Sequence, residues 1–163
     1  MRTILPITAA ILALGATPSQ AARIFVSNER DNTVTVLDLD TLETLATIKT
    51  GERPRGIITT PDHKEVLVCA GDDAKLDGID PATLKIARSL DSGPDPELLA
   101  VDPANTRIYI ANEDDAMVTV MDLKTGDVIK EIEVGVEPEG MAVSPDSKLV
   151  VATSESTSMA HFI

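Results

Sequence analysis

Ionisable residues flank three prolines that stand 42 residues apart, Pro54, Pro96 and Pro138. If the segments that carry them surround one axis, arginine and carboxylate side chains would meet at a common rim. Such a rim suits a polar small molecule, a cation or the basic loop of a partner protein. The alternative is a solvated charged surface without a ligand. The six candidate rim-binding residues are Arg53, Arg55, Asp95, Glu97, Glu137 and Glu139.

Paired carboxylates could also carry acid–base chemistry. Two like charges held close together raise one pKa, and Glu97 and Glu139 form such a pair if neighbouring repeats bring them together. The sequence does not set their distance. It contains no nucleophile elbow, phosphate-binding loop or CxxCH haem attachment. We therefore assign no catalytic residue and find no cofactor evident, and we keep an enzyme that uses the rim as the alternative.

Metal sites receive little support from the spacing of the candidate ligands. The acidic runs 72–73 and 113–115 offer the oxygen ligands that Ca²⁺ prefers, but neither has the spacing and glycines of an EF-hand or RTX loop. His63 and His161 lie far apart in the repeat and form no i, i+4 pair, which argues against zinc or copper. The sequence predicts no metal site.

The same interval of 42 residues recurs in the segments that must position these side chains. The apolar segments 24–28, 66–70, 108–112 and 150–154 begin 42 residues apart. Within the unit 54–93, four short apolar or alternating runs are separated by polar turns, without a helical period. A repeat of about 40–50 residues made of short strands is typical of a propeller blade, and a blade has four antiparallel strands.

The predicted fold is all-β, a partial β-propeller of about 3.3 four-stranded blades of 42 residues. Because a propeller has at least four blades, we expect a fragment of a longer protein rather than a half-propeller that closes as a homodimer. The expected divisions are a signal peptide at 1–21 and an incomplete propeller at 22–163, with a partial blade at 24–51, blades at 54–93 and 96–135, and a truncated blade at 138–163.

Residues that recur in each repeat have structural explanations. An aspartate ends the third strand and accepts hydrogen bonds from the turn that follows it. The prolines begin strands, where no amide N–H is needed, and the preceding glycines are expected to adopt positive φ. Gly78 replaces a strand valine, so we expect its strand to be weak or bulged. The aspartates are Asp38, Asp80 and Asp122, and the glycines are Gly51, Gly93 and Gly135.

The chain is acidic, with 27 acidic and 14 basic residues and a formal net charge of −13. This charge argues against nucleic acid or an anionic membrane surface as a partner, because both need a positive footprint. In a propeller, the loops beside the three prolines share one face with the turns 29–32, 72–75, 113–116 and 155–158. These segments hold most of the charge, so we expect a partner protein or a polar small molecule to dock on this acidic face.

Residues 1–21 have the pattern of a secretory signal peptide: Arg2, an apolar run over 4–16, and small residues before Ala22. We therefore expect an exported, periplasmic protein without a membrane span after cleavage. Cys69 is the single cysteine and cannot form an internal disulfide. We expect it to be a small buried filler.

Several motifs resemble the YVTN-type β-propeller repeat. They are Ile-Tyr-Ile-Ala-Asn at 108–112, Val-Thr-Val-Met-Asp-Leu-Lys-Thr-Gly at 118–126 and Ser-Pro-Asp-Ser-Lys at 144–148, and the resemblance extends over 24–163. The stretches 51–56, 92–97, 135–141 and 159–162 are similar to the exported propeller proteins associated with pyrroloquinoline-quinone-dependent alcohol catabolism. This resemblance implies a seven-bladed protein of roughly twice this length.

Three functions are compatible with the resemblance. The leading hypothesis is a periplasmic binding or scaffold protein associated with quinone-dependent catabolism, more readily a non-enzyme than an enzyme. The second is a propeller enzyme or quinoprotein subunit with its site at the central channel, although the cofactor ligands of the related quinoprotein amine dehydrogenases and of the nitrite reductase haem domain are not recognisable here. The third is a cell-surface adhesion array, in which YVTN-type repeats also occur.

Overall fold

The computed structural model describes residues 22–163, so the predicted signal peptide lies outside the described residues. This part of the chain forms fourteen β-strands. Within it, no helix has the length and apolar character needed to cross a membrane. The prediction of an all-β fold is confirmed.

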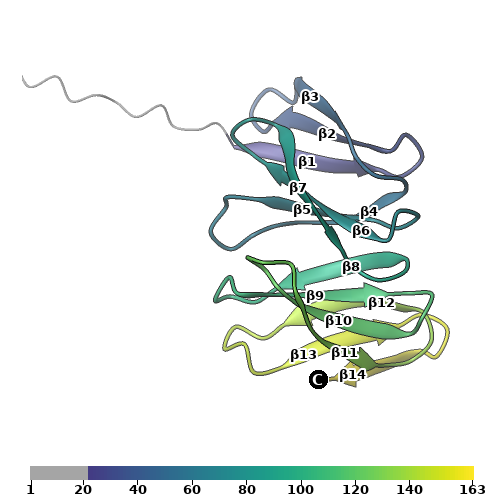
Figure 1. The fold of residues 1–163 in the computed structure, drawn as a ribbon. Coiled ribbons are helices and arrows are strands. Elements are labelled where there is room, and N and C mark those ends of the chain that lie inside the picture. Colours follow the sequence, from purple (N-terminus) through teal and green to yellow (C-terminus); the bar gives the residue numbers. More distant parts are fainter. Residues whose placement is uncertain (1–21) are drawn as a thin grey trace, which may run out of the picture.

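The strands form four antiparallel sheets that follow one another in chain order (Figure 1). The first sheet contains β1 (Arg23–Asn28), β2 (Thr33–Asp38) and β3 (Thr44–Lys49). The second contains β4 (Pro54–Thr59), β5 (Val66–Ala70), β6 (Lys75–Asp80) and β7 (Lys85–Asp91). The third contains β8 (Pro96–Val101), β9 (Arg107–Asn112), β10 (Met117–Asp122) and β11 (Val128–Glu133). The fourth contains β12 (Pro138–Val143), β13 (Val150–Ser154) and β14 (Met159–Phe162).

Each sheet is a simple meander, in which every strand pairs with the next strand in the chain. This is the arrangement of a propeller blade, and it confirms the prediction of a partial β-propeller. Pro54, Pro96 and Pro138 each begin the first strand of a sheet, as predicted. The three prolines therefore fix where the chain enters each of these blades.

The hydrophobic core lies between the blades. Side chains alternate along a strand, so β5 packs Val66 and Val68 against the first sheet and Leu67 and Cys69 against the third. All five residues of β5 are consequently buried. A similar cluster around Tyr109 joins the third sheet to the fourth. The stacking of sheet on sheet fixes the loops at the ends of the strands relative to one another.

Cys69 is fully buried in this core, as expected for a small filler. Burial, assisted by the negative charge of Glu97, raises the pKa of its thiol far above the ordinary value. A thiol in such a site stays protonated and is a poor nucleophile.

The aspartate turns have the predicted hydrogen bonds. Asp122 accepts the backbone N–H groups of Lys124 and Thr125 at 2.9 and 2.8 Å, and Asp38 and Asp80 act in the same way in their own turns. The backbone N–H of Thr125 is the main cause that lowers the pKa of Asp122. These carboxylates lie at the end of the blades opposite the prolines.

The expectation about Gly78 is right in outcome and wrong in cause. A register shift separates Gly78 from Ile79 where β6 pairs with β7. However, equivalent shifts follow Val36 and Val120 in the other repeats, so the bulge belongs to the repeat. A Cβ atom at Gly78 would collide with the Glu65 carboxylate. The glycine therefore makes room for a side chain above it.

The predicted positive φ of the loop glycines holds only at Gly93, where φ is 95°. Gly51 and Gly135 do not adopt it, and the left-handed residue is instead the one directly before each proline. These residues are Arg53 (φ 55°), Asp95 (φ 46°) and Glu137 (φ 54°). The glycines are needed for space, since a Cβ atom at Gly51 would lie 2.8 Å from the Cβ of Ala70.

Candidate functional site

The loops before β4, β8 and β12 are held by backbone hydrogen bonds that repeat from blade to blade. The carbonyl of the left-handed residue accepts an N–H from the turn after the second strand of its blade: Gly71 donates to Arg53, Glu113 to Asp95 and Glu155 to Glu137. The Asn32 side chain also accepts the Arg53 N–H at 2.9 Å. A left-handed conformation costs non-glycine residues about 1–2 kcal/mol, so these bonds hold the rim loops in a strained but defined shape.

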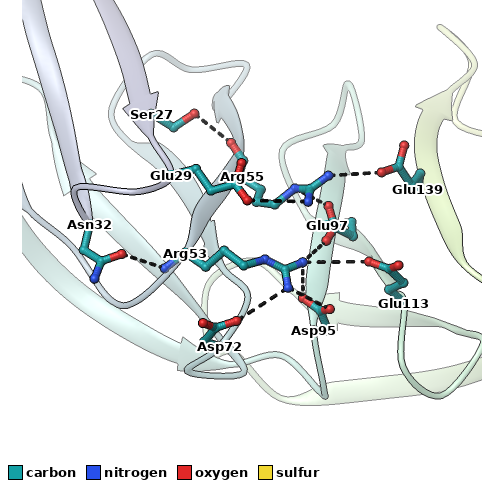
Figure 2. Close-up of polar contacts among 10 residues, drawn as sticks. All are labelled: Ser27, Glu29, Asn32, Arg53, Arg55, Asp72, Asp95, Glu97, Glu113 and Glu139. Atoms are coloured by element: carbon teal, nitrogen blue, oxygen red, sulfur yellow. Dashed lines mark hydrogen bonds and ion pairs between the residues drawn. The ribbon is translucent and has the colours of Figure 1, made fainter.

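Arg53 extends from the second blade into the third (Figure 2). Its guanidinium forms ion pairs with Glu97 and with Asp95, the latter at 2.8 Å, and lies 3.8 Å from the Glu113 carboxylate. It also lies 3.5 Å from the exposed Asp72 of its own blade. Hydrogen bonding to Glu97 raises the pKa of Arg53. Arg53 thus supplies positive charge to a group of three carboxylates.

Arg55 of the second blade pairs with carboxylates of the three other blades. Its Nε lies 2.5 Å from Glu97, and its terminal nitrogens reach Glu139 of the fourth blade at 3.1 Å and Glu29 of the first at 3.8 Å. Ser27 anchors the Arg55 carbonyl with a hydrogen bond of 2.8 Å. Figure 2 shows these carboxylates around the arginine. The loops of four blades therefore meet in one network of charges, here called the rim cluster: Glu29, Arg53, Arg55, Asp72, Asp95, Glu97, Glu113 and Glu139.

Glu97 is the centre of the rim cluster. Its side chain is only 1% exposed, and both arginines pair with it. A buried carboxylate is tolerated when charged hydrogen-bond donors satisfy its oxygens. Glu97 therefore fastens the third blade to the second, and it is not accessible to a ligand.

Glu113 has the most altered acidity of the rim. A hydrogen bond with Glu97, together with burial and the charges of Glu97 and Asp95, raises the pKa of Glu113 to about 7. Burial likewise raises the pKa of Asp95. Carboxylate oxygens of Asp95, Glu97 and Glu113 lie within 4.8 Å of one another, a spacing that suits a cation. The guanidinium of Arg53 contacts the same three carboxylates.

The structure brings together five of the six predicted rim residues: Arg53, Arg55, Asp95, Glu97 and Glu139. Glu137 joins no ion pair among residues 22–163, and its backbone carbonyl is what holds its loop. Glu97 and Glu139 are linked through Arg55 rather than facing each other as an acid–base pair. The rim thus resembles a network of ion pairs more than a pair of catalytic carboxylates.

Sequence reasoning missed three members of the rim cluster, Glu29, Asp72 and Glu113. It placed them on the acidic face without assigning them to the rim. A signal was present, because Glu29 and Glu113 occupy the same position of the repeat, as does Glu155. The length of an arginine side chain explains the result: Arg53 and Arg55 reach beyond their own blade to acids on these turns.

Comparisons with known proteins agree with the fold. A family model described as YNCE-like beta-propeller matches residues 1–104. The hydrazine synthase of Kuenenia stuttgartiensis is a similar solved structure, with a TM-score of 0.80 and 21% sequence identity over 86% of this chain. The chain spans 42% of the length of that structure. At this identity the likeness concerns the fold alone.

A search of curated proteins found no match. The matched family model covers more than half of the chain, and the four stacked meander sheets have the architecture that its description names. The chain therefore belongs to the YNCE-like beta-propeller family.

Proposed function

We propose that this chain is a binding or scaffold protein whose acidic face receives a positively charged group of a partner protein. The observation that carries the proposal is the composition of the rim cluster, in which two arginines meet six carboxylates from four blades. The excess of negative charge at one end of the blades favours a cationic ligand and attracts it over a distance.

The accessible carboxylates define where such a group would bind. The side chains of Glu97 and Asp95 are largely buried, with 1% and 13% exposed. Three others are accessible to a ligand: Glu29 (54% exposed), Asp72 (54%) and Glu139 (36%). A lysine or arginine of a partner would therefore pair with the exposed three. Glu97 and its arginines would keep the rim in shape beneath it.

The expected setting is the periplasm, in association with pyrroloquinoline-quinone-dependent catabolism. The signal-peptide pattern of residues 1–21 and the subfamily motifs at 51–56, 92–97 and 135–141 support this part of the proposal. Co-purification with a tagged chain from the periplasm of bacteria grown on an alcohol would test it. Recovery of a quinoprotein or its electron acceptor in an amount that falls with added salt is expected. Recovery that is independent of salt would count against docking on the acidic face.

A defined probe tests the chemistry of the rim without knowledge of the partner. Tetralysine should bind the wild-type chain, and Glu139→Gln together with Glu29→Gln should weaken binding several-fold at low salt. The same peptide with all four lysine side chains acetylated is the control, because it lacks the side-chain charges. Asp40→Asn with Asp127→Asn is the matched control protein, because it removes the same charge at the opposite end of the blades. Equal weakening by both double variants would contradict the proposal.

A further inference from the structure

A pocket of about 290 Å³ lies between the third and fourth blades, at the end of the strands opposite the rim cluster. Its floor includes Tyr109, Val120 and Val150, which are at most 6% exposed. Three cationic side chains surround it, Arg107, Lys130 and Lys148, and no carboxylate side chain lines it. In a chain of net charge −13, a pocket whose strongly charged side chains are all cationic stands out.

The preceding pair of blades shows how this position is filled elsewhere. Arg88 of β7 and Glu65 beside β5 form a two-pronged ion pair, with Arg88 Nε and one terminal nitrogen at 2.7 and 2.6 Å from the two Glu65 oxygens. Lys130 stands 42 residues after Arg88, and Arg107 stands 42 residues after Glu65. The repeat thus replaces an ion pair by two like charges at the same place.

Neither Arg107 nor Lys130 forms a direct ion pair with a protein carboxylate. No ion pair in the described residues involves Arg107 or Lys130, whereas Lys148 lies 3.6 Å from Asp146. The nearby Asp102 is engaged, since its oxygens accept the N–H groups of Thr106 and Arg107 and the Thr106 hydroxyl. The side chains of Arg107 and Lys130 are both exposed, so solvent screens their mutual repulsion, and an anion between them would be attracted by both charges.

Tyr109 adds a polar group to the pocket. Its side chain is only 6% exposed and lines the pocket. Within residues 22–163 its hydroxyl has no hydrogen-bond partner, and it is not one of the enclosed polar atoms, so it is open to the pocket. The hydroxyl is therefore free to bond a polar group that enters the pocket.

We propose that this pocket binds a small organic anion with an apolar body, specifically an aliphatic monocarboxylate. The guanidinium fork of Arg107 matches a carboxylate, Lys130 adds a second positive charge, and the Tyr109 hydroxyl can donate to the same group. The valines below accept the alkyl chain. This site goes beyond the proposed function and does not depend on it.

Isothermal titration calorimetry with hexanoate tests the proposal. Hexanamide is the uncharged analogue, and acetate is a carboxylate without the longer alkyl chain. Hexanoate should bind the wild-type chain at least tenfold more tightly than either control. Arg107→Glu would place a carboxylate beside Lys130, as Glu65 lies beside Arg88 in the preceding blade. The variant should therefore keep or raise the melting temperature, while its affinity for hexanoate falls at least tenfold. Lys49→Glu makes the same charge change on exposed β3 and should leave the affinity unchanged.

Three results would overturn the proposal: no binding of hexanoate to the wild-type chain, equal binding of hexanamide, or unchanged affinity in Arg107→Glu. If Arg107→Glu does not fold, Lys130→Gln replaces it, because Lys130 is exposed and has no ion pair to lose. Its affinity for hexanoate should also fall, and an unchanged affinity would equally reject the site.

Discussion

Replacing Glu113 by glutamine should make the protein more stable at alkaline pH and leave it unchanged at acidic pH. Glu113 has a pKa of about 7 in the folded chain, against an ordinary value of 4.5, because it hydrogen-bonds Glu97 and lies beside Asp95. Between these two pH values, Glu113 keeps a proton in the folded chain that it has released in the unfolded chain. The stability of the wild-type protein therefore falls as the pH rises from about 4.5 to 7, and it is level above that range.

The size of the effect follows from the shift. A rise from 4.5 to about 7 corresponds to roughly 3.4 kcal/mol at full strength, at about 1.36 kcal/mol per unit. A quarter of the Glu113 side chain is exposed, at 26%, and solvent screens the repulsion. We therefore expect Glu113→Gln to gain about 1–2 kcal/mol at pH 8 and close to nothing at pH 4, where the carboxyl is neutral in both states.

Urea unfolding at pH 4 and pH 8, followed by circular dichroism, measures this difference as a shift in midpoint at constant slope. Asp114→Asn is the control, since Asp114 is an exposed neighbour on the same turn that joins no ion pair in the described residues. A Glu113→Gln variant that loses stability at pH 8, or whose gain is the same at both pH values, would refute the argument that Glu97 and Asp95 oppose its ionisation.

Four further outcomes follow from the fold and the cluster. Gly78→Ala should destabilise by about 1–3 kcal/mol through overlap with Glu65, and Glu65→Ala should remove most of that penalty in a double-mutant cycle by urea unfolding. Glu97→Ala leaves two arginines without their shared partner and should cost about 2–4 kcal/mol in the same assay. Asp122→Ala should lower the urea midpoint by loss of its turn hydrogen bonds. Cys69 should react with a thiol reagent at the rate of global unfolding, because its thiol is buried and its pKa is raised.

Much of the fold could be predicted from the sequence, because one interval recurs in residues of very different kinds. The prolines, the turn aspartates and the apolar segments each mark an element, and their common spacing places four strands in every repeat. The burial of strands β5 and β9 was predictable as well. Both strands face a hydrophobic core on either side, and their sequences are continuous apolar runs. Short strands and tight turns leave little freedom between such landmarks.

The candidate site was predictable only in part, for a physical reason. The period gives the blade on which each charge lies but not the direction in which a long side chain extends. Arg53 could have paired within its own blade at Asp72, yet its closer partners are Asp95 and Glu97 of the next blade. The glycine expectation failed similarly, because composition does not show which loop residue takes the left-handed conformation.

The most direct test of the proposed binding role is to locate tetralysine by NMR chemical-shift titration of the labelled chain. Perturbations are expected only at the rim, at the loops 51–55, 93–97 and 135–139 and at the turns that contain Glu29, Asp72 and Glu113, and they should disappear with added salt. Equal perturbations at the aspartate turns on the opposite end of the blades, or none at the rim, would contradict it.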